Sequence, residues 1–473
     1  MQKTITIEPI TRIEGHARVT LQMGEDGHVE DAHLHVTQVR GFEKLAEGRP
    51  FREMPSLTAR ICGICPVSHL LASAKACDEL MSLDIPPTAV KLRKLLNYAQ
   101  MVQSHALSYF YLSAPDLLLG MDAEQPVRNI AGLIAAAPET ARLGIRLRQF
   151  GQDLIEQLGG KRIHNAWVIP GGVKEPLKVT TRDQTLGAIA EVKAIAINTI
   201  DSFIGLLAAH EEEIQSFANF PTMYMGTVNE DGSLEHYDGI LRLVDENDEI
   251  VEVDIPHDKF YDYIGEATES FSYLKSPYYR PAGYPQGMYR VGPLARLHVA
   301  KTCGTPAADR ALDQFREIPG SQRHSAFYYH YTRLIELLHG IERIEELLNE
   351  PDILSKKVRA QAKPNQGEGV GIIEAPRGTL IHHYKADEHG AITDVNLIVA
   401  TGHNIMAMNK GVKQVAQHFV HGDQLTEGAL NRVEAVVRAF DPCLSCATHA
   451  IGQMPMHIQL LGPDGTLLDE VRR

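Results

Sequence analysis

The sequence predicts an α+β protein that is mainly α-helical, with a large multihelical core and smaller β-structure at the N-terminus and edges. Two long regions, 55–217 and 324–350, carry apolar residues at three- and four-residue spacing, which is the pattern of amphipathic helices. Residues 4–39 alternate between apolar and polar side chains, as strands do. Since no internal repeat or low-complexity linker appears, residues 1–473 are predicted to form a single large domain.

Local patterns predict the individual elements in turn. At the N-terminus, "TITI", "ARVTLQM" and "HVEDAHLHVT" read as strands, with "GEDG" as the turn of a hairpin. Long helices are predicted for "AVKLRKLLNYAQMVQSHALSYFYLSA", "IAEVKAIAINTIDSFIGLLAAHEEEIQSF" and "HSAFYYHYTRLIELLHGIERIEELLNE". Residues 221–300 hold short strands such as "GILRLV" and "EIVEVDI". The strands "GTLIHHYKAD" and "VNLIVA" precede a helix over about residues 411–420 and a last helix that leads into Asp441.

The composition excludes some classes of protein. A formal net charge of -14 argues against a nucleic-acid partner, because phosphate binding needs clustered Lys and Arg. No continuous run approaches the roughly 20 apolar residues of a membrane span. The start, "MQKTITIEPITRIEGH", lacks the apolar core of a signal peptide. We therefore expect a cytoplasmic protein, unless it is exported attached to a partner that carries the signal.

The cysteines are concentrated in two short motifs. Four of the six form two CxxC pairs, "RICGICPVSH" (60–69) and "DPCLSCATH" (441–449), while Cys77 and Cys303 are predicted to be buried core thiols. Pro66 suits the first turn of a helix, and Asp441 followed by proline reads as an N-cap and N1. Both pairs are therefore predicted to lie at helix N-termini, where the helix dipole favours thiolates.

Three kinds of site are compatible with these motifs. A structural Cys₄ zinc site has the same signature, but its halves normally lie within about 20 residues of each other. Here 381 residues separate Cys62 from Cys443. A thioredoxin-like dithiol lacks its βαβ context. A catalytic soft-metal centre assembled from distant segments fits best.

Six motifs together resemble those of the [NiFe] hydrogenase large subunit. Besides the two cysteine motifs they are "TRIEGH" (11–16), "RGFE" (40–43), "SHALSYFYLSAPD" (104–116) and "EAPRGTL" (374–380). They occur in the order of that family and span nearly the whole chain. The residues around the first cysteine pair are most similar to the cytoplasmic, bidirectional, NAD-reducing branch.

The resemblance implies a nickel–iron centre with named protein ligands. Nickel would be held by Cys62, Cys65, Cys443 and Cys446, of which Cys65 and Cys446 would also bridge to an iron that carries CO and two cyanides. Thiolates suit this role because they are soft, strongly donating and able to bridge two metals.

The resemblance also implies roles for residues around the metals. Glu14 would relay protons and His69 would hydrogen-bond near a bridging sulfur. Arg377 would lie over the metals, and Asp116 and Asp441 would be its carboxylate partners. Because a guanidinium is normally always protonated, stabilising developing negative charge is the role that physics favours. Arg377 would act as a base only if its pKa were strongly depressed.

Further residues would bind iron ligands and a magnesium ion. Thr401 and Pro376 would contact the diatomic ligands, although "IVATGHN" (398–404) departs from the "VVPSTWN" of many relatives. Glu43, His449 and the backbone carbonyl of Leu397 would hold Mg²⁺. The other histidines, including His382 and His383, show no ligand pattern and are predicted to be solvated or structural.

The implied reaction is H₂ ⇌ 2H⁺ + 2e⁻, with partners that carry the electrons away. Two lone cysteines cannot ligate an iron–sulfur cluster, so a small subunit with a cluster and FMN-bearing diaphorase subunits that reduce NAD⁺ are expected. Alternatives are another acceptor (deazaflavin, a heterodisulfide-reductase partner or sulfur) and a non-catalytic, complex I-like structural subunit. Metal analysis and the partner subunits would separate them.

The last 24 residues, 450–473, are predicted to form a hairpin, because "MHIQLL" and "TLLDEV" alternate around "GPDG". A permanent hairpin is one interpretation. The family implies instead that a maturation endopeptidase removes this extension after His449, once nickel-insertion proteins have acted.

Overall fold

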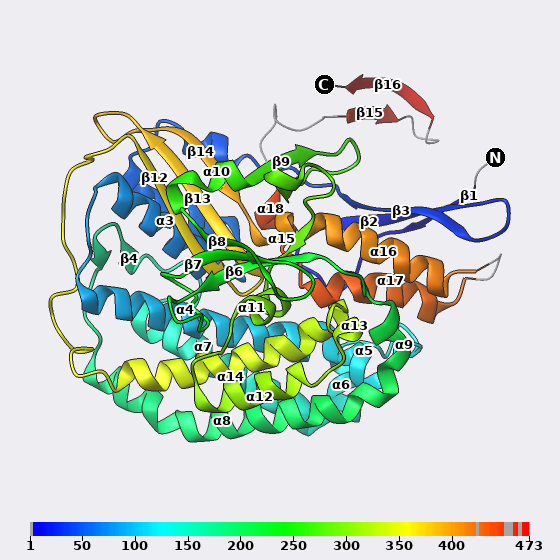
Figure 1. The fold of residues 1–473 in the computed structure, drawn as a ribbon, viewed down its shortest axis with the longest axis horizontal. Coiled ribbons are helices and arrows are strands. Elements are labelled where there is room, and N and C mark those ends of the chain that lie inside the picture. Colours follow the sequence, from blue (N-terminus) through cyan, green and yellow to red (C-terminus); the bar gives the residue numbers. More distant parts are fainter. Residues whose placement is uncertain (1–2, 422–424, 449–456, 462–465, 473) are drawn as a thin grey trace.

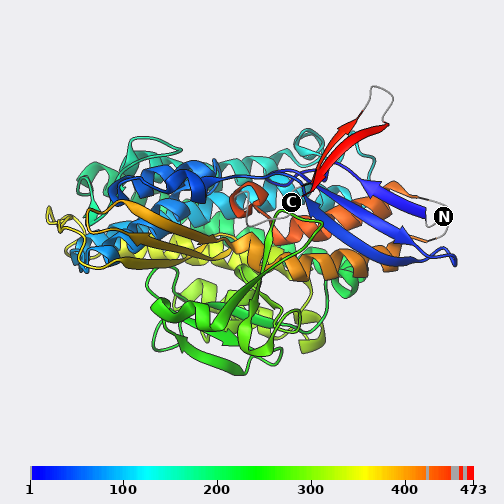
Figure 2. The same cartoon turned by 90° about the horizontal axis from the view of Figure 1, so that it is seen from above.

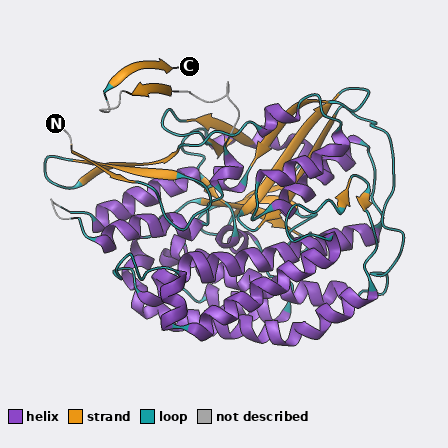
Figure 3. Cartoon of the chain, turned by 180° about the vertical axis from the view of Figure 1, so that it is seen from behind, coloured by secondary structure: helices purple, strands orange, loops and turns teal. Residues whose placement is uncertain are grey.

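The computed structural model describes residues 3–421, 425–448, 457–461 and 466–472. Long helices form a layer along one side, and small sheets lie across the other (Figure 1). Viewed from behind, the helical layer again occupies one side of the molecule (Figure 3). The α+β class, mainly helical with β-structure at the N-terminus and edges, is confirmed.

Four helices form the bundle: α4 (Pro87–Leu107), α7 (Pro138–Gly159), α8 (Val179–Leu206) and α14 (Tyr329–Leu348). Helix α4 packs on α7 and α14, and α8 packs on α7 and α14. Helix α14 is buried along nearly all of its length because it lies at the centre of these contacts. Its apolar spacing is the pattern from which the sequence predicted it.

A three-stranded sheet covers the helix that follows the first cysteine pair. Its strands are β12 (Glu368–Ala375), β13 (Gly378–Ala386) and β14 (Ile392–Ile398), in antiparallel order, and β12 lies against α3 (Pro66–Leu80). A Cβ at Gly371 would lie 1.9 Å from the carbonyl oxygen of Ala72. The glycine-rich "GEGVG" therefore serves close packing of a strand on a helix backbone.

The N-terminal sheet consists of β1 (Lys3–Ile7), β2 (Ala17–Met23) and β3 (Val29–Val36), paired antiparallel as predicted. Strand β3 packs on α16 (Ile405–Phe419), which begins six residues earlier than the sequence suggested. A third group of strands extends from one side of the molecule in Figure 2: β6 (Met223–Val228), β7 (Ile240–Val244), β8 (Ile250–Ile255), β9 (Ile264–Thr268), β10 (Lys275–Tyr279) and β11 (Tyr289–Arg290). The sequence predicted β7 and β8 among these.

The remaining elements are mostly short. They are α1 (Phe42–Ala46), α2 (Met54–Thr58), α5 (Ala114–Leu119), α6 (Ile130–Ala136), α9 (Glu211–Ser216), α10 (Phe260–Tyr263), α11 (Pro293–Val299), α12 (Pro306–Arg316), α13 (Gly320–Arg323), α15 (Ala400–His403), α17 (Glu427–Phe440), α18 (Leu444–Ala447), β4 (Val168–Ile169) and β5 (Gly172–Val173). Between α4 and α5 the chain makes one π-helical segment, Ser108–Ser113.

One expectation needs correction. Asp441 is not an N-cap: it follows the last residue of α17 with φ 53°, and Cys443 is the residue that precedes α18. The left-handed backbone ends α17 abruptly and redirects the chain. The run Val179–Ser216 is also long and apolar enough to cross a membrane by length and composition alone. Within it, α8 packs on α7 and α14, and 33% of its most apolar stretch is buried.

The predicted C-terminal hairpin is present as β15 (His457–Leu461) and β16 (Leu467–Arg472), paired antiparallel. The turn "GPDG" lies outside the described residues. In Figures 1 and 2 the two strands lie apart from the body of the molecule. Residues 466–470 are all exposed.

Candidate metal centre

The two cysteine motifs meet in the interior of the protein. Cys62 and Cys65 precede α3, whereas Cys443 and Cys446 lie at α18, and all four are buried. Their sulfur atoms lie within 4.8 Å of one another. The Cys62–Cys443 and Cys65–Cys446 sulfur pairs are 3.4 and 3.6 Å apart. The prediction that the motifs form halves of one cluster therefore agrees with the geometry.

The separations between the four sulfur atoms bracket those of one tetrahedral metal site, since the Cys443–Cys446 pair is 2.7 Å apart and all four atoms lie within 4.8 Å of one another. A metal with metal–sulfur bonds of about 2.3 Å in a tetrahedron separates its sulfurs by roughly 3.8 Å. Because zinc and nickel both meet this condition, the distances alone leave the choice between them open. Burial raises the pKa of the Cys446 thiol well above its ordinary value, so metal binding to the cluster would have to release protons.

Backbone contacts fix the second motif against the N-terminal segment. The Leu444 amide donates to the carbonyl oxygen of Glu14 (3.1 Å), and residues 14 and 443 form a β-bridge. The Cys443 amide donates to Thr401 Oγ1 (2.8 Å), and Arg40 Nη2 donates to Ser445 Oγ (2.9 Å). Segments far apart in sequence thus hold the cysteine loop in one position.

Glu14 connects this cluster to the surface. Its Oε2 accepts hydrogen bonds from Cys443 Sγ (3.2 Å) and from the Ser445 amide (2.9 Å). The Glu14 residue is half-buried. A carboxylate in this position can exchange a proton with the sulfur on one side and with solvent on the other.

Arg377 lies beside the same sulfur atoms. It donates from Nε to the Asp441 carbonyl oxygen (2.7 Å) and from Nη2 to Asp441 Oδ1 (3.0 Å). Arg377, Cys65 and Cys443 line one enclosed space, and Arg377 Nη1 has no hydrogen-bond partner among the described residues. Burial lowers the pKa of this guanidinium, but Asp441 and the cysteine thiolates outweigh burial and raise it well above its ordinary value. This direction opposes a role as a base.

The predicted pairing of Asp116 with Arg377 is wrong. Asp116 instead pairs with Arg12 Nη2 (2.5 Å) and with Arg438 Nε (3.0 Å), and it accepts a hydrogen bond from Asn431 (3.1 Å). The π-helical segment precedes Asp116 and shifts the register of the chain. Asp116 therefore ties the "TRIEGH" segment to α17 rather than orienting the arginine at the metal site.

His69 belongs to a buried chain of hydrogen bonds that the sequence did not indicate. Its Nδ1 lies 3.1 Å from His382 Nε2, and His382 Nδ1 lies 2.6 Å from the hydroxyl of Tyr384. A hydrogen bond from His69 contributes to lowering the pKa of Cys65, after those from Cys443, Cys446 and Cys62. The predicted strand "GTLIHHYKAD" could have indicated the contact between His382 and Tyr384, because residues two apart in a strand share a face.

The magnesium ligands are brought together only in part. Glu43 is buried, and its Oε1 accepts a hydrogen bond from the Leu397 amide (3.4 Å). His449 lies outside the described residues. The adjacent Thr448 forms a β-bridge with Leu274.

A buried ion network holds the "EAPRG" segment. Arg296 in α11 donates from Nε and Nη2 to the two carboxylate oxygens of Glu336 (both 2.6 Å). Its Nη1 reaches Glu374 Oε2 (2.7 Å) and the Ala375 carbonyl (2.9 Å), and its Nη2 reaches the Pro376 carbonyl (3.3 Å). Arg296 thus fixes the backbone immediately before Arg377, which no motif had suggested.

Comparisons with known proteins identify the kind of metal centre. Residues 40–132 and 221–449 match the family model described as nickel-dependent hydrogenase, and residues 4–39 match one described as HoxL-like. The chain belongs to the nickel-dependent hydrogenase family. It is therefore an oxidoreductase that acts on H₂, and this membership favours a nickel–iron centre over zinc at the four cysteines.

Known hydrogenases are similar to this chain in sequence and in structure along nearly its whole length. It is 42% identical over 489 residues to the "NAD-reducing hydrogenase HoxS subunit beta" of Cupriavidus necator, with 100% of both chains covered. It is 42% identical to one chain of the F420-non-reducing hydrogenase vhu of Methanocaldococcus jannaschii, over 87% of this chain and 98% of the relative. A crystal structure of an NAD⁺-reducing [NiFe]-hydrogenase superposes with a TM-score of 0.92 and 44% identity, covering 94% and 99% of the two chains.

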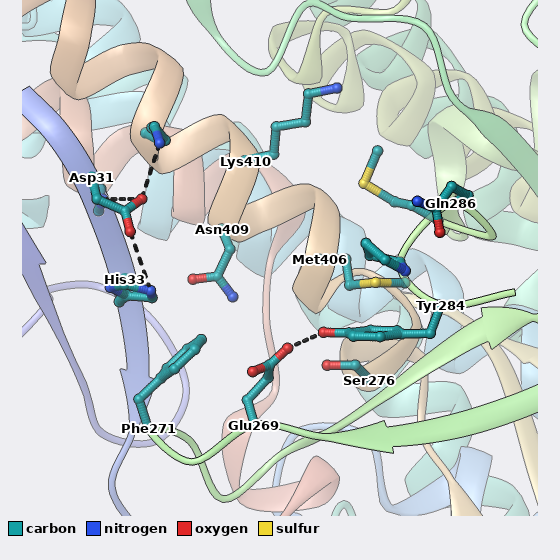
Figure 4. A pocket seen from close by; sticks show the side chains of 14 residues that line it. Asp31, His33, Glu269, Phe271, Ser276, Tyr284, Gln286, Met406, Asn409 and Lys410 are labelled. Carbon is teal, nitrogen blue, oxygen red and sulfur yellow. Dashed lines mark hydrogen bonds and ion pairs between the residues drawn. The ribbon is translucent and has the colours of Figure 1, made fainter.

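A larger hollow lies elsewhere. Figure 4 shows this cavity of about 740 Å³ between β3, α16 and residues 269–288. Two of its charged groups already pair with each other, since Lys413 Nζ lies 3.1 Å from Asp31 Oδ1, and Tyr284 hydrogen-bonds to Glu269. None of the four clustered cysteines lines it. The small space beside Arg377, by contrast, is lined by Cys65, Cys443 and Cys446.

Proposed function

We propose that this hydrogenase is the catalytic subunit in which a Ni–Fe(CO)(CN)₂ centre cleaves H₂ reversibly and heterolytically into protons and electrons. The convergence of four buried sulfurs from motifs 381 residues apart carries the proposal. All four cysteines would hold nickel, and the thiolates of Cys65 and Cys446 would also hold the iron. The diatomic ligands are assigned to the side lined by Pro376, Arg377 and Thr401.

When bound, the centre supplies the site at which H₂ is split and the route by which its electrons leave. Glu14 accepts the proton held at Cys443 Sγ and passes it outward, because its carboxylate contacts that sulfur and is half-buried. Arg377 stays protonated, and its Nη1, which has no hydrogen-bond partner among the described residues, can stabilise negative charge that develops in the space it lines together with the cysteines. Asp441 orients its guanidinium by accepting hydrogen bonds from Nε and Nη2.

Elemental analysis together with infrared spectroscopy tests the proposal. We expect nickel and iron in equal amounts, with absorption bands of one CO and two cyanide ligands. Zinc in place of both metals, without these bands, would show that the cluster is structural.

We assign the transport of electrons away from the metal centre to partner subunits. Cys77 and Cys303 are buried and separate from the cluster, so among the described residues they offer no four-thiolate site for an iron–sulfur cluster. A small subunit with such a cluster and FMN-bearing diaphorase subunits that reduce NAD⁺ fit the relative named NAD-reducing, which matches over its full length. The relative from Methanocaldococcus keeps another acceptor as the alternative. The subunit composition of the purified enzyme decides between them. A cytoplasmic location follows from NAD⁺ as acceptor.

A magnesium ion is assigned to Glu43, the backbone carbonyl of Leu397 and His449. The contact between Glu43 and the Leu397 amide supports this assignment. Few protein ligands leave room for the several waters that Mg²⁺ normally retains.

Replacing Glu14 by glutamine is expected to block proton transfer while nickel and iron remain in place. The amide is nearly isosteric but cannot take up and release a proton at neutral pH. H/D exchange between D₂ and water should fall by about 100-fold or more, within the range that positioned acid–base groups contribute. Unchanged exchange in a variant with full metal content would rule out Glu14 as the main relay.

The chain is expected to be a precursor whose active form ends at His449. Thr448 is buried and pairs with Leu274, whereas residues 466–470 are exposed. A maturation endopeptidase is therefore assigned to remove residues 450–473 after nickel-insertion proteins have loaded the site. Intact mass spectrometry of active enzyme should show the loss of 24 residues, and nickel-starved cells should accumulate the long form. Active enzyme that still ends in Arg473 would contradict this expectation.

A further inference from the structure

A buried chain of hydrogen bonds runs from the first cysteine motif into the sheet that covers α3. Its members are His69 of α3 and His382 and Tyr384 of β13, and all three side chains are buried. Nδ1 of His69 lies 3.1 Å from Nε2 of His382, and Nδ1 of His382 lies 2.6 Å from the hydroxyl of Tyr384. We call it the histidine–tyrosine chain. Neither His382 nor Tyr384 has a role in the function proposed above.

The fold explains how this chain reaches the cysteines. His382 and Tyr384 are two apart in a strand and therefore share one face of β13, which packs on α3. Helix α3 begins directly after Cys65, so His69 lies near its first turn, four residues from that cysteine. Strand β13 begins directly after Arg377. The same segment therefore supplies both the arginine beside the sulfur atoms and the hydrogen-bond partner of His69.

The available protons give the histidine–tyrosine chain a direction. A neutral imidazole has one N–H donor and one acceptor nitrogen. His69 hydrogen-bonds to Cys65 as well as to His382. Because a metal-bound thiolate can only accept, the nitrogen of His69 that faces the sulfur must carry the proton, and this nitrogen is Nε2. Nδ1 of His69 is then an acceptor, so His382 must donate to it from Nε2.

Tyr384 supplies the proton at the other end of the chain. Burial lowers the pKa of His382 well below its ordinary value, so this imidazole is neutral, and its Nδ1 accepts once Nε2 donates. Burial raises the pKa of Tyr384 well above its ordinary value, so the hydroxyl keeps its proton and can donate to Nδ1 of His382. Every hydrogen bond then points toward the sulfur, and such bonds strengthen one another. The opposite direction would leave the sulfur facing a nitrogen without a proton.

We propose that Tyr384 and His382 are positioning residues, which fix the tautomer of His69 so that it donates a hydrogen bond to the sulfur of Cys65. The proposal rests on the function proposed above, in which that sulfur would hold both nickel and iron, and it adds two residues that act on the sulfur through His69. A hydrogen bond to a thiolate withdraws electron density from the sulfur and hence from the metals that the sulfur binds. The histidine–tyrosine chain therefore sets how strongly Cys65 donates electron density to iron.

Infrared spectra of the full enzyme carrying Tyr384→Phe test the proposal. Without the hydroxyl, His382 is no longer held in one tautomer, and His69 loses the donor that keeps its own proton at Nε2. The sulfur then donates more electron density to iron, so the CO and cyanide bands should move to lower wavenumber and activity should fall by about 10-fold. Tyr224→Phe is the matched control, because Tyr224 is equally buried and its hydroxyl lies 2.8 Å from Nδ1 of His324. Neither residue of that pair lines the space beside the cysteines, so its bands should stay at the wild-type positions.

Two variants of His382 separate hydrogen bonding from packing, and they give a result even if Tyr384→Phe yields little loaded enzyme. A glutamine amide donates near the place of Nε2 without any choice of tautomer. His382→Gln should therefore keep the wild-type bands, and adding Tyr384→Phe to it should shift nothing further. His382→Leu has no donor and should shift the bands as Tyr384→Phe does.

The outcomes also separate this proposal from the function itself. Unshifted bands in Tyr384→Phe or His382→Leu, or an equal shift in Tyr224→Phe, would overturn the role of the chain while the hydrogenase assignment stands. A further shift when Tyr384→Phe is added to His382→Gln would overturn it too. Wild-type enzyme without CO and cyanide bands would refute the proposed function first, and this proposal with it.

Discussion

Replacing Cys446 by serine is expected to abolish H₂ oxidation and to remove both metals from the purified protein. Its sulfur lies 2.7 Å from that of Cys443 and 3.6 Å from that of Cys65, so it contributes to both sides of the cluster. A serine hydroxyl is a hard oxygen donor that stays protonated at neutral pH. It would therefore not replace the soft, anionic ligand that we propose for nickel and iron at this position. Nickel and iron content, measured after normal maturation, should fall to background together with activity.

Cys303→Ser is the matched control. Cys303 is equally buried, and burial raises the pKa of its thiol well above the ordinary value. It lies outside the cluster. This variant should keep its metals and its activity at some cost in stability. Full activity in Cys446→Ser, or equal metal loss in both variants, would show that Cys446 is not a ligand.

The cysteine pairs and Glu14 could be predicted because motifs preserve chemistry in short local patterns. Each CxxC pair is recognisable by itself, and Glu14 was assigned because "TRIEGH" resembles a motif of the family, so neither prediction needed knowledge of the chain path. Helix α14 and the N-terminal hairpin could be predicted for the same reason, since periodicity is local. In each case the signal lies within about 20 residues of sequence.

The contacts that could not be predicted join segments across the fold. Asp116 had the right residue type for a partner of Arg377, but the π-helical segment and Arg438 of α17 decide where it points. The short strands β6 and β9 lack clear alternation because one is buried along most of its length and the other is half-exposed. The turn of Asp441 into the left-handed region likewise depends on what α17 packs against.

Replacing Arg296 by methionine is expected to cause the largest loss of stability that we predict. Arg296, Glu336 and Glu374 are completely buried, and the methionine would leave two carboxylates without their cation. Breaking a buried pair by removing one partner costs about 3–5 kcal/mol. The hydrogen bonds to Ala375 and Pro376 would be lost as well, so Arg377 should be held less firmly and activity should fall. Thermal denaturation at a fixed scan rate measures the first effect.

The loss of stability in Arg296→Met should become smaller as the pH falls from about 7.5 to about 5.5. In the wild type, burial raises the pKa of Glu336, but Arg296 and His105 outweigh burial and hold it well below its ordinary value. This depressed pKa gives stability that is present above the unfolded-state value of about 4.3 and disappears only as pH falls below it. Without Arg296, burial is the largest influence on Glu336 and only the hydrogen bonds from His105 and His236 oppose it, so we expect the folded-state pKa to rise above the unfolded one. The variant then gains stability as pH falls, and its deficit should be smaller at about pH 5.5 than at about pH 7.5.

Arg146→Met provides a matched comparison at the surface. Arg146 also makes a bidentate pair, from Nε and Nη2 to Glu191, but both side chains are partly exposed. Exposed pairs contribute about 0–1 kcal/mol because water solvates both charges when the pair is broken. The two variants thus lose the same chemical group and differ in burial. If they were equally stable, or if the Arg296 variant lost more stability at low pH than at neutral pH, the buried carboxylates would not be the source of the effect. If the buried network of Arg296, Glu336 and Glu374 is the source, only Arg296→Met should lose much stability. That loss should become smaller as the two carboxylates take up protons.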